Sequence, residues 1–537
     1  MHTGLGGFAA EFKGTDLNTL LKDPDVLGVS FDARIRAPRV TVKTIADYPH
    51  AGSPNYDAQA LRATLGLART NMGRGTGIAV VDSGIAPVAD LAPRISAFYD
   101  FTMGGTAVAR MPSDEYGHGT HVAGLIAGSG ASSGRRYVGM APGAHLIGLK
   151  VLDGEGAGYT SDVIAAIEFA IANKRALGID VLNLSLGHPI FEAAATDPLV
   201  QVVERAVRAG IVVVVSAGSL GMNPATGEIG YAGITSPGNA PSALTVGASR
   251  HRGTATREDD EIAMFSSRGP TWSDGFIKPD VLAPGQALVA AVSRTSKLYA
   301  VAGLAEPKEA TDGYAKLSGT SMAAAVTSGV VALMIEANRR DEGLRSVLTP
   351  NTVKAILQFT AIPLPDSDPT TPSVLEQGTG SINGAGAIAL TRAINPAAPV
   401  GSPWLETGIA QFSTIAGTML AWSNHIVWGD HIVWGDTAFW HLEAFDDHVV
   451  WGDNEDDHIV WGDDDHIVWG DSFIHDVNVV MQSVSTWGQH IVSSSDDDHV
   501  VWGDDDHVVW GEDDDHVVWG EDDHVVRGAS LILSLEL

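Results

Sequence analysis

The sequence predicts an α/β domain built on a parallel sheet, followed by an acidic tail that is β-rich or partly disordered. Two observations predict the domain: short apolar stretches alternate with segments of helical periodicity, and those stretches are apolar at nearly every position. Strand–helix alternation is typical of a parallel sheet with right-handed crossovers, and continuously apolar strands indicate that both sheet faces are covered. A third observation, a short motif that repeats from residue 425 onward, separates the tail from the domain.

The predicted strands lie at residues 78–82, 146–152, 181–186, 211–216 and 244–246. Between them, residues 163–171 and 199–207 place apolar side chains at the spacing of one helical face, and a later helix is predicted over 350–361. Helices on both faces of such a sheet make a three-layer domain. Because the carboxyl ends of parallel strands gather at one edge of the sheet, we expect functional side chains there.

The acidity of the chain is confined to the tail. Residues 425–537 hold 28 Asp and Glu against a single arginine, a net charge of −27 that leaves −5 for the rest of a chain whose total is −32. This balance argues against nucleic-acid binding, because phosphate contacts require Lys and Arg. Cysteine is absent, which excludes disulfide and thiol chemistry but leaves the cellular compartment open.

No apolar run reaches the roughly 18 residues that a membrane-spanning helix needs, so we expect no transmembrane segment. The first residues are not followed by a basic and then an apolar region, so we expect no signal peptide in the chain as given.

Three motifs carry the candidate chemistry: GIAVVDSG (77–84), GHGTHVAG (117–124) and GTSMAA (319–324). Asp82 ends an apolar strand, His118 opens a helix, and Ser321 lies in the first turn of a helix that is apolar on nearly every side. A lone serine there would be more simply an N-cap. Together, however, carboxylate, imidazole and hydroxyl are the groups that make a serine nucleophilic, because the hydroxyl needs a base and the base needs an orienting acid.

In this order and context, the motifs resemble those of the subtilisin-like serine peptidase family over roughly residues 57–395. The resemblance implies that Asp82 orients and stabilises the imidazolium, that His118 is the general base and that Ser321 is the nucleophile. His121, three residues beyond His118, is expected to pack or to hydrogen-bond locally.

The resemblance also implies a substrate cleft. Two backbone edges would pair with an extended peptide, and a wall of small residues would line the pocket for the P1 side chain. The implied residues are Ser185, Leu186 and Gly187 on one edge, Gly156, Ala157 and Gly158 on the other, and Ser216, Ala217 and Gly218 in the wall. Leu220 beyond the wall favours an apolar or aromatic P1 residue; the alternative is that these are plain core strands with glycine turns.

The sequence departs from the family pattern at Ser219, where relatives carry an asparagine whose amide helps to hold the oxyanion. A hydroxyl is shorter than a carboxamide, so we expect a slowed enzyme rather than an inactive one. The alternative is a weakened or pseudo-peptidase that binds peptides or ions, with the tail as its attachment to a surface. Ala325 stands where relatives have proline, and little chemical effect is expected.

Five segments are expected along the chain. Residues 1–37 resemble part of an inhibitory propeptide, with a frayed extension as the alternative, and residues 38–56 form a linker that would contain the maturation cut. The catalytic domain follows at 57–395, then a second linker at 396–424 and the repeat tail at 425–537.

The tail repeats His-(Ile/Val)-Val-Trp-Gly followed by Asp or Glu, at a step of eight or nine residues where the copies are tightest. Each unit predicts a short strand and a turn, and such units must stack, bind a partner or stay disordered. The clustered carboxylates suit Ca²⁺, and His beside Asp suits Zn²⁺, whereas the alternative is a solvated run of charge. No metal ligands are assigned, and a cell-surface role for the tail stays open.

The expected function is therefore that of a secreted or cell-envelope serine endopeptidase that cuts extended or unfolded protein. Its expected partners are protein or peptide substrates and its own propeptide. The chemistry requires no cofactor, and Ca²⁺ as a structural ion is left open.

Overall fold

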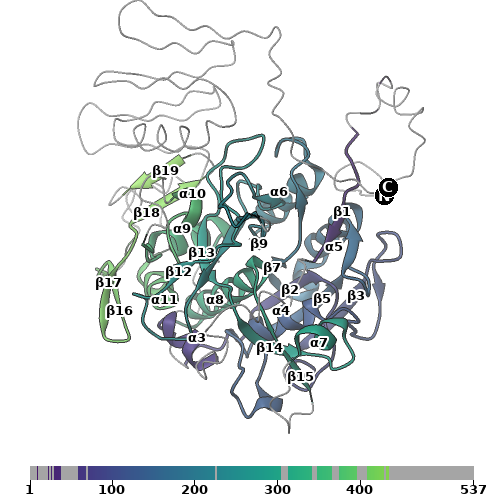
Figure 1. Ribbon diagram of the computed structural model, residues 1–537. Helices are drawn as coiled ribbons and strands as arrows, with labels where there is room; N and C mark the ends of the chain where they lie inside the picture. Colours follow the sequence, from purple (N-terminus) through teal and green to yellow (C-terminus); the bar gives the residue numbers. More distant parts are fainter. Residues whose placement is uncertain are drawn as a thin grey trace, which may run out of the picture. The chain divides into compact units, whose positions relative to one another are not determined.

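In the part of the chain that the structure describes, a nine-stranded sheet carries the α/β fold that the sequence predicts (Figure 1). The strands follow the order β12-β11-β9-β7-β2-β5-β3-β4, and β13 also pairs with β11. β4 and β12 join the sheet antiparallel to their neighbours, and the other strands pair in parallel. The strands are Gly77–Asp82 (β2), Ile95–Asp100 (β3), Val108–Ala109 (β4), His145–Lys150 (β5), Ile179–Leu184 (β7), Val212–Ser216 (β9), Leu244–Arg250 (β11), Glu261–Ile262 (β12) and Val281–Pro284 (β13).

This computed structural model describes residues 29–37, 58–67, 70–223, 226–303, 312–341, 348–365, 374–395, 408–428 and 431–434, with single positions at Ala9, Lys22, Val26 and Leu405. The helices within them are Ala58–Thr64 (α3), His118–Ala127 (α4), Thr160–Leu177 (α5), Pro198–Arg208 (α6), Lys297–Ala302 (α7), Thr320–Asp341 (α8), Pro350–Phe359 (α9), Val374–Gln377 (α10) and Gly384–Ala393 (α11), with a 3-10 turn at Ala131–Ser133. Short strand pairs outside the large sheet are His188–Pro189 (β8) with Thr235–Ser236 (β10), and Leu288–Val292 (β14) with Gly313–Leu317 (β15).

Helices cover both faces of the sheet, which explains why its strands are apolar throughout. Apolar residues of α5 and α6 share one buried cluster with Ala79 and Val81 of β2. Because side chains alternate across a strand, Ile78 and Val80 point to the opposite face, where α4 and α8 pack on the sheet. Each fully buried Val, Leu or Ile side chain contributes about 1.5–3 kcal/mol, so this two-sided burial makes the centre of the sheet rigid.

Helix α8 lies in the core of the α/β domain. Residues Thr320–Arg339 are long and apolar enough to cross a membrane by length and composition, but the apolar 18-residue window within them is entirely buried inside the protein. Its packing partners are β7, β9, β11 and β13 of the sheet together with α4 and α11. The helix is thus apolar on every side because it is surrounded by protein.

The five strands that the sequence predicts are all present as β2, β5, β7, β9 and β11, and the five helices that it predicts in the domain correspond to α4, α5, α6, α8 and α9. Among the strands of the large sheet with four or more residues, the sequence analysis missed β3 and β13. In β3 only Phe98 and Asp100 are buried, so its residues lack the continuous apolar character by which the other strands were found. β13, with four residues, is too short for a periodic pattern.

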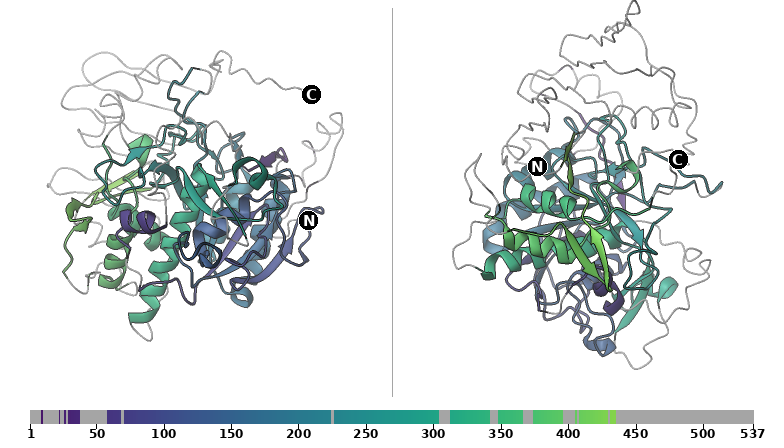
Figure 2. Two further views of the ribbon diagram at one scale, coloured as in Figure 1. Left: turned by 60° about the horizontal axis from the view of Figure 1, so that its bottom comes forward. Right: turned by 90° about the vertical axis from the view of Figure 1, so that its left-hand side faces the viewer.

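Residues 396–424, expected as a second linker, include ordered structure on the domain. Phe412–Ile415 (β16) and Thr418–Ala421 (β17) form a hairpin that contacts α11, and the right-hand view of Figure 2 shows it in light green against the green helices. Trp422 is buried, and its Nε1–H donates to Ser413 Oγ at 3.0 Å. The first two copies of the tail repeat form strands, His425–Trp428 (β18) and His431–Trp434 (β19), and the later copies lie outside the described residues.

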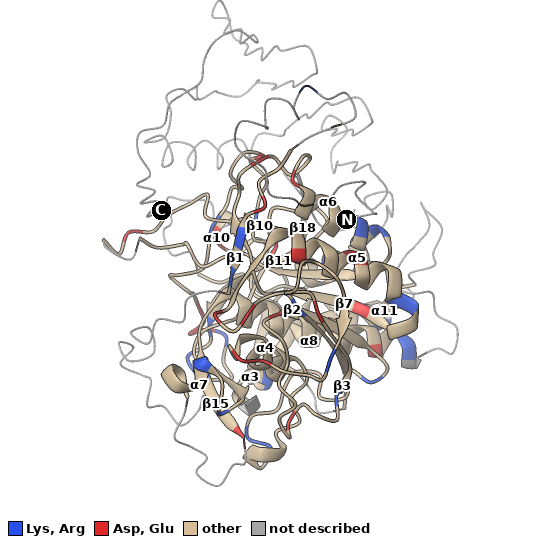
Figure 3. Cartoon of the chain, turned by 90° about the vertical axis from the view of Figure 1, so that its right-hand side faces the viewer, with Lys and Arg blue, Asp and Glu red and all other residues tan. Residues whose placement is uncertain are grey.

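Charged residues in the described part of the chain are interspersed rather than sorted by sign, as Figure 3 shows from one side. The strongly acidic repeats lie outside the described residues, apart from the copies in β18 and β19.

Candidate active site

Asp82 lies at the carboxyl end of β2, near the centre of the sheet. β5 pairs with all six residues of β2 and β7 pairs with five of them, so the end of the strand is held firmly. The Asp82 side chain is fully buried, and its Oδ1 accepts a hydrogen bond of 2.7 Å from the Ser83 backbone N–H. A buried carboxylate needs such donors, because an unpaired buried charge is costly.

His118 begins helix α4 directly opposite this carboxylate. Its Nδ1 lies 2.8 Å from Asp82 Oδ1 and 2.9 Å from Asp82 Oδ2. Because an ionised carboxylate only accepts, Nδ1 carries the proton and Nε2 is the basic nitrogen of the neutral ring. Among the residues that the structure describes, the buried Nε2 has no hydrogen-bond partner. The ring is therefore oriented by Asp82 and open for a proton at Nε2.

Opposing effects act on the pKa of His118. Burial favours the neutral ring, while the charge and hydrogen bonds of Asp82 and the charge of Asp114 favour the imidazolium, and the pKa is raised above 6.5. His121 behaves in the opposite way: burial and the neighbouring His118 lower its pKa to about 3. His121 Nε2 lies 3.1 Å from the Ala315 carbonyl oxygen, so this ring is a neutral core group.

Ser321 is the second residue of α8 and is fully buried. Its hydroxyl donates to the Ser185 carbonyl oxygen at 3.1 Å and makes no hydrogen bond with His118. The Ser185 hydroxyl in turn lies 3.1 Å from the Ser321 carbonyl oxygen and 3.0 Å from Asn183 Oδ1. The first turn of α8 is thereby fastened to the residue that follows β7.

The sheet brings these groups to one edge. β2 and β7 are parallel neighbours in which Val81 is opposite Leu184, so Asp82 and Ser185 follow at the same end of adjacent strands. Adjacent strands lie about 4.8 Å apart. Helices α4 and α8, which begin at His118 and Thr320, pack against each other on one face of these strands. The structure thus pairs Asp82 with His118 directly, and the hydrogen bond from Ser321 to Ser185 holds the start of α8 at the end of the neighbouring strand β7.

Ser219 follows the wall residues at the end of β9. Gly218 has a φ of 105°, which favours glycine, and Thr320 fixes it: Thr320 Oγ1 accepts from the Gly218 N–H at 3.2 Å and donates to the Gly218 carbonyl at 3.1 Å. The loop with Ser219 is therefore tied to the residue that precedes Ser321. The Ser219 hydroxyl oxygen is buried and has no hydrogen-bond partner among the described residues.

The expected wall of the P1 pocket continues this loop. Ser216 and Ala217 are buried, and the Ala217 carbonyl accepts from the Thr235 N–H at 3.1 Å. Leu220, in contrast, is 56% exposed beside Gly233, and a Cβ added at that glycine would meet Leu220 Cβ at 3.3 Å. The loop therefore presents an apolar side chain to solvent where the wall ends.

Both expected substrate edges are occupied by the chain's own N-terminal segment. Arg34–Arg36 (β1) pairs antiparallel with Ala157–Tyr159 (β6), and the Ala37 N–H donates to the Gly156 carbonyl at 2.9 Å. On its other side, Arg36 forms an isolated antiparallel bridge with Gly187. Ile35 is fully buried, whereas Arg34 and Arg36 are exposed. A short strand of this chain thus lies between the two edges.

The sequence analysis assigned residues 1–37 to a propeptide-like segment but did not identify this strand. Its signal was present, because Ala33, Ile35 and Ala37 alternate with polar residues over positions 32–37, which is the pattern of a half-buried strand. Apart from Ala9, Lys22 and Val26, residues 1–28 of this segment lie outside the described residues.

The Subtilase family model matches residues 73–386 of the sequence, which is more than half of the chain. This range includes every candidate catalytic and cleft residue named above. The chain belongs to the subtilase family. The resemblance found in the sequence is thereby confirmed for the catalytic domain.

Named relatives agree with this assignment. Serine protease AprX of Bacillus subtilis (strain 168) is 39% identical over 320 residues, which are 59% of this chain and 66% of the relative. Subtilisin of Bacillus sp. (strain TA39) is 31% identical over 61% of this chain and 72% of its own length. The chain thus spans about two thirds of the length of these relatives.

A cold adapted subtilisin-like serine proteinase of known structure is 27% identical in sequence, with a TM-score of 0.41, over 59% of this chain and 89% of that protein.

In the part of this subtilase that the structure describes, no three His, Asp or Glu residues are grouped closely enough to hold a metal ion. Asp90 shows how a buried carboxylate is satisfied instead: it accepts from the Ser132 N–H at 2.8 Å and from the Tyr314 hydroxyl at 2.8 Å. The tail carboxylates that suit Ca²⁺ or Zn²⁺ lie outside the described residues.

Proposed function

We propose that this subtilase is a serine endopeptidase in which Asp82, His118 and Ser321 form the catalytic triad. The observation that carries the proposal is the doubly hydrogen-bonded Asp82–His118 pair, which leaves His118 Nε2 buried, basic and without a partner among the described residues. A base held in this way, beside the first turn of a helix that carries a serine, suits acyl transfer.

In the proposed reaction, Ser321 Oγ attacks the scissile carbonyl carbon while His118 Nε2 takes the hydroxyl proton. Asp82 stabilises the imidazolium that results and keeps the ring in the required tautomer. His118 then gives the proton to the leaving amine, and a water molecule, deprotonated by the same nitrogen, releases the acyl group from Ser321.

The Ser321 hydroxyl must first leave the Ser185 carbonyl, to which it donates in this structure. A substrate strand that pairs with the edge at Ser185–Gly187 offers a backbone N–H to that carbonyl and so competes with the hydroxyl. Rotation about a serine Cα–Cβ bond is fast compared with turnover. We therefore propose that substrate binding itself redirects Ser321 toward His118.

Ser219 is proposed as a weak oxyanion donor. Its buried, unpartnered hydroxyl and its attachment through Gly218 and Thr320 to the start of α8 support this role. Loss of one such donor lowers turnover by about 10²–10³-fold, and a short hydroxyl replaces a carboxamide only in part. We therefore expect a slow peptidase.

The substrate is proposed to be an extended or unfolded protein segment with an apolar P1 residue. β1 supports the first part, because it lies as an extended strand against Gly156–Gly158 and Gly187 through main-chain contacts. The exposed Leu220 supports the second part. Since β1 occupies the edges that a substrate would need, we propose that this propeptide-like segment inhibits the enzyme until it is removed, by a cut within residues 38–56.

Secretion or a cell-envelope location, and binding of divalent cations or a cell surface by the tail, are further proposals that rest on sequence alone. The ion proposal predicts that Ca²⁺ or Zn²⁺ changes the circular dichroism of the isolated tail, and an unchanged spectrum would remove it.

Labelling with a fluorophosphonate probe tests the proposed function, with Ser321→Ala as the control. A fluorophosphonate reacts with the activated serine without pairing to the edges that β1 occupies, so we expect time-dependent labelling of the full chain that is absent from Ser321→Ala. Equal labelling of both proteins, or of neither, would instead favour the weakened, peptide-binding alternative.

A further inference from the structure

Asp114, four residues before His118, is a buried carboxylate that the proposed reaction does not use. Its side chain is 5% exposed and accepts four hydrogen bonds. Oδ1 accepts from Ser83 Oγ at 2.9 Å and from the Gly117 N–H at 2.7 Å, whereas Oδ2 accepts from the Thr120 N–H at 2.8 Å and from Thr120 Oγ1 at 2.6 Å. All four partners donate to the carboxylate, which favours its ionised form, but burial acts more strongly and raises the pKa of Asp114 above its ordinary value.

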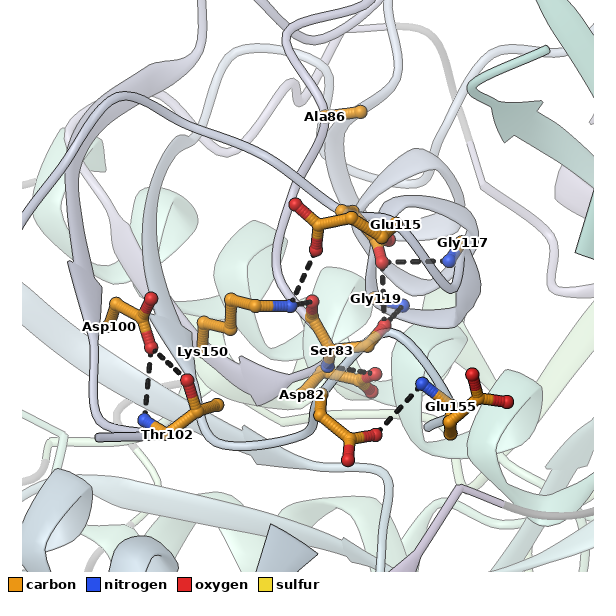
Figure 4. Close-up of polar contacts among 12 residues, drawn as sticks. Asp82, Ser83, Ala86, Asp100, Thr102, Glu115, Gly117, Gly119, Lys150 and Glu155 are labelled. Carbon is orange, nitrogen blue, oxygen red and sulfur yellow. Dashed lines mark hydrogen bonds and ion pairs between the residues drawn. The ribbon is translucent and has the colours of Figure 1, made fainter. Parts of the chain in front are cut away.

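These bonds fix both neighbours of the Asp82–His118 pair. Ser83 directly follows Asp82, and Gly117 directly precedes His118. The Ser83 hydroxyl continues the chain of contacts, because it accepts from the Gly119 N–H at 3.0 Å. Figure 4 shows Ser83, Gly117 and Gly119 gathered beside Asp82. One carboxylate therefore links the end of β2 to the first turn of α4.

Helix α4 depends on this carboxylate at its start. Gly117, its N-cap, has a φ of 104° and no side chain to accept from the free N–H groups of the first turn. Asp114 takes that place through the Thr120 N–H. The first turn of α4 packs tightly on the end of β2, since a Cβ added at Gly119 would meet the Gly84 carbonyl oxygen at 2.2 Å and Asp82 Cβ at 3.0 Å. A small shift of α4 would therefore move the His118 ring against Asp82.

We propose that Asp114, through Ser83, is a positioning residue for His118 that sets both the placement and the proton affinity of the catalytic imidazole. The inference rests on the proposed function. The ionisable groups that bear on His118 are Asp82 and Asp114, which raise its pKa, and His121, whose own pKa is about 3 and which is therefore neutral. In its ionised form, Asp114 adds a second negative charge to that of Asp82 beside the imidazolium.

The test compares two buried helix-capping aspartates. Asp197 caps α6 by the same chemistry: it accepts from the Leu199 N–H at 2.8 Å and from Ser236 Oγ at 2.7 Å. Both Asp114→Asn and Asp197→Asn should lower the urea midpoint of unfolding, because each weakens a helix cap. Only Asp114→Asn should lower kcat, by about tenfold at nearly unchanged KM, because a displaced base is costly to the chemical step.

The pH profile separates positioning from structure. Asp114→Asn should move the acidic limb of kcat/KM toward lower pH by about half a unit, while Asp197→Asn leaves it in place. Ser83→Ala keeps the Asp114 carboxylate but removes the hydroxyl that links it to the Gly119 N–H, so it should lower kcat without moving the acidic limb. If Asp114→Asn does not fold, Ser83→Ala alone tests the positioning role. Wild-type kinetics in both Asp114→Asn and Ser83→Ala would overturn the proposal. An inactive wild type would instead refute the proposed function.

A readout that needs no activity accompanies these kinetics. In the Ser321→Ala background, the pKa of His118 measured by ¹⁵N-histidine NMR should fall when Asp114→Asn is added. An unchanged pKa would overturn the electrostatic part of the proposal.

Discussion

At the scale of single residues, the proposed oxyanion donor Ser219 can be tested by substitution. Ser219→Asn should raise kcat on a peptide substrate by about tenfold or more at nearly unchanged KM, because a carboxamide reaches further than a hydroxyl. Ser219→Ala is the matched control and should lower kcat. If Asn leaves the turnover unchanged while Ala reduces it, the serine hydroxyl already serves as a full donor and the slow-enzyme prediction is wrong.

The titration of His118 gives a prediction for pH dependence. A general base works only when it is unprotonated, and the pKa of His118 is raised above 6.5, so kcat/KM should rise with pH along a limb centred above 6.5. The same shift means that the His118–Asp82 ion pair stabilises the fold fully below pH 6.5 and loses this contribution as pH rises through the raised pKa. A limb centred at or below 6.5 in the pH profile would contradict this account.

Among single residues, Asp82, His118 and Ser321 could be predicted together from the sequence because each lies in a distinctive motif. It could not show that the Ser321 hydroxyl bonds to the Ser185 carbonyl, since that contact joins residues 136 positions apart. Asp114 was missed for a similar reason. An aspartate before a helix is common, and its four donors come from two separate segments of chain.

At the scale of elements, strand β1 is the feature with the clearest consequence. Ile35→Asp should weaken its docking, because Ile35 is fully buried and a carboxylate placed there is costly to bury. We expect faster hydrolysis of a peptide by the full chain, or a shorter lag before hydrolysis begins. Arg34→Asp introduces the same carboxylate at the exposed neighbouring position and should change the rate little. Equal rates for the two variants would remove the inhibitory role proposed for β1.

The elements show where sequence patterns suffice. β2 and β9 were predicted because a strand buried on both faces is apolar at every position, which few other structures require. β3 is partly exposed and β1 pairs with residues more than 100 positions away, so their identity as strands depends on partners that a local pattern does not contain. The hairpin β16–β17 was expected as linker, although its strands alternate between exposed and less exposed residues, with Phe412 and Met419 exposed to solvent.

For the whole molecule, a buried ion pair joins distant parts of the fold. Arg268 Nε lies 2.7 Å from Glu376 Oε1, both side chains are 1% exposed, and Arg268 also donates to the Gly221 carbonyl beside the Leu220 loop. Glu376→Ala should reduce the free energy of unfolding by about 3–5 kcal/mol, because it leaves a buried guanidinium without its carboxylate.

Urea unfolding followed by tryptophan fluorescence measures this change. Glu261, whose side chain is 45% exposed and pairs with Arg250 and Arg252, provides the matched control. Glu261→Ala should cost less than about 1 kcal/mol. Similar losses for both variants would show that the buried pair does not hold the fold together as described.

The central claim is that His118 and Ser321 act as one catalytic unit. Groups that act in the same step are not additive, so His118→Ala, Ser321→Ala and the double variant should each lower kcat of peptide hydrolysis by about the same factor, of the order of 10⁶. Measuring kcat for these three proteins beside the wild type tests the claim most directly. Losses that multiply in the double variant, or hydrolysis that survives Ser321→Ala, would contradict it.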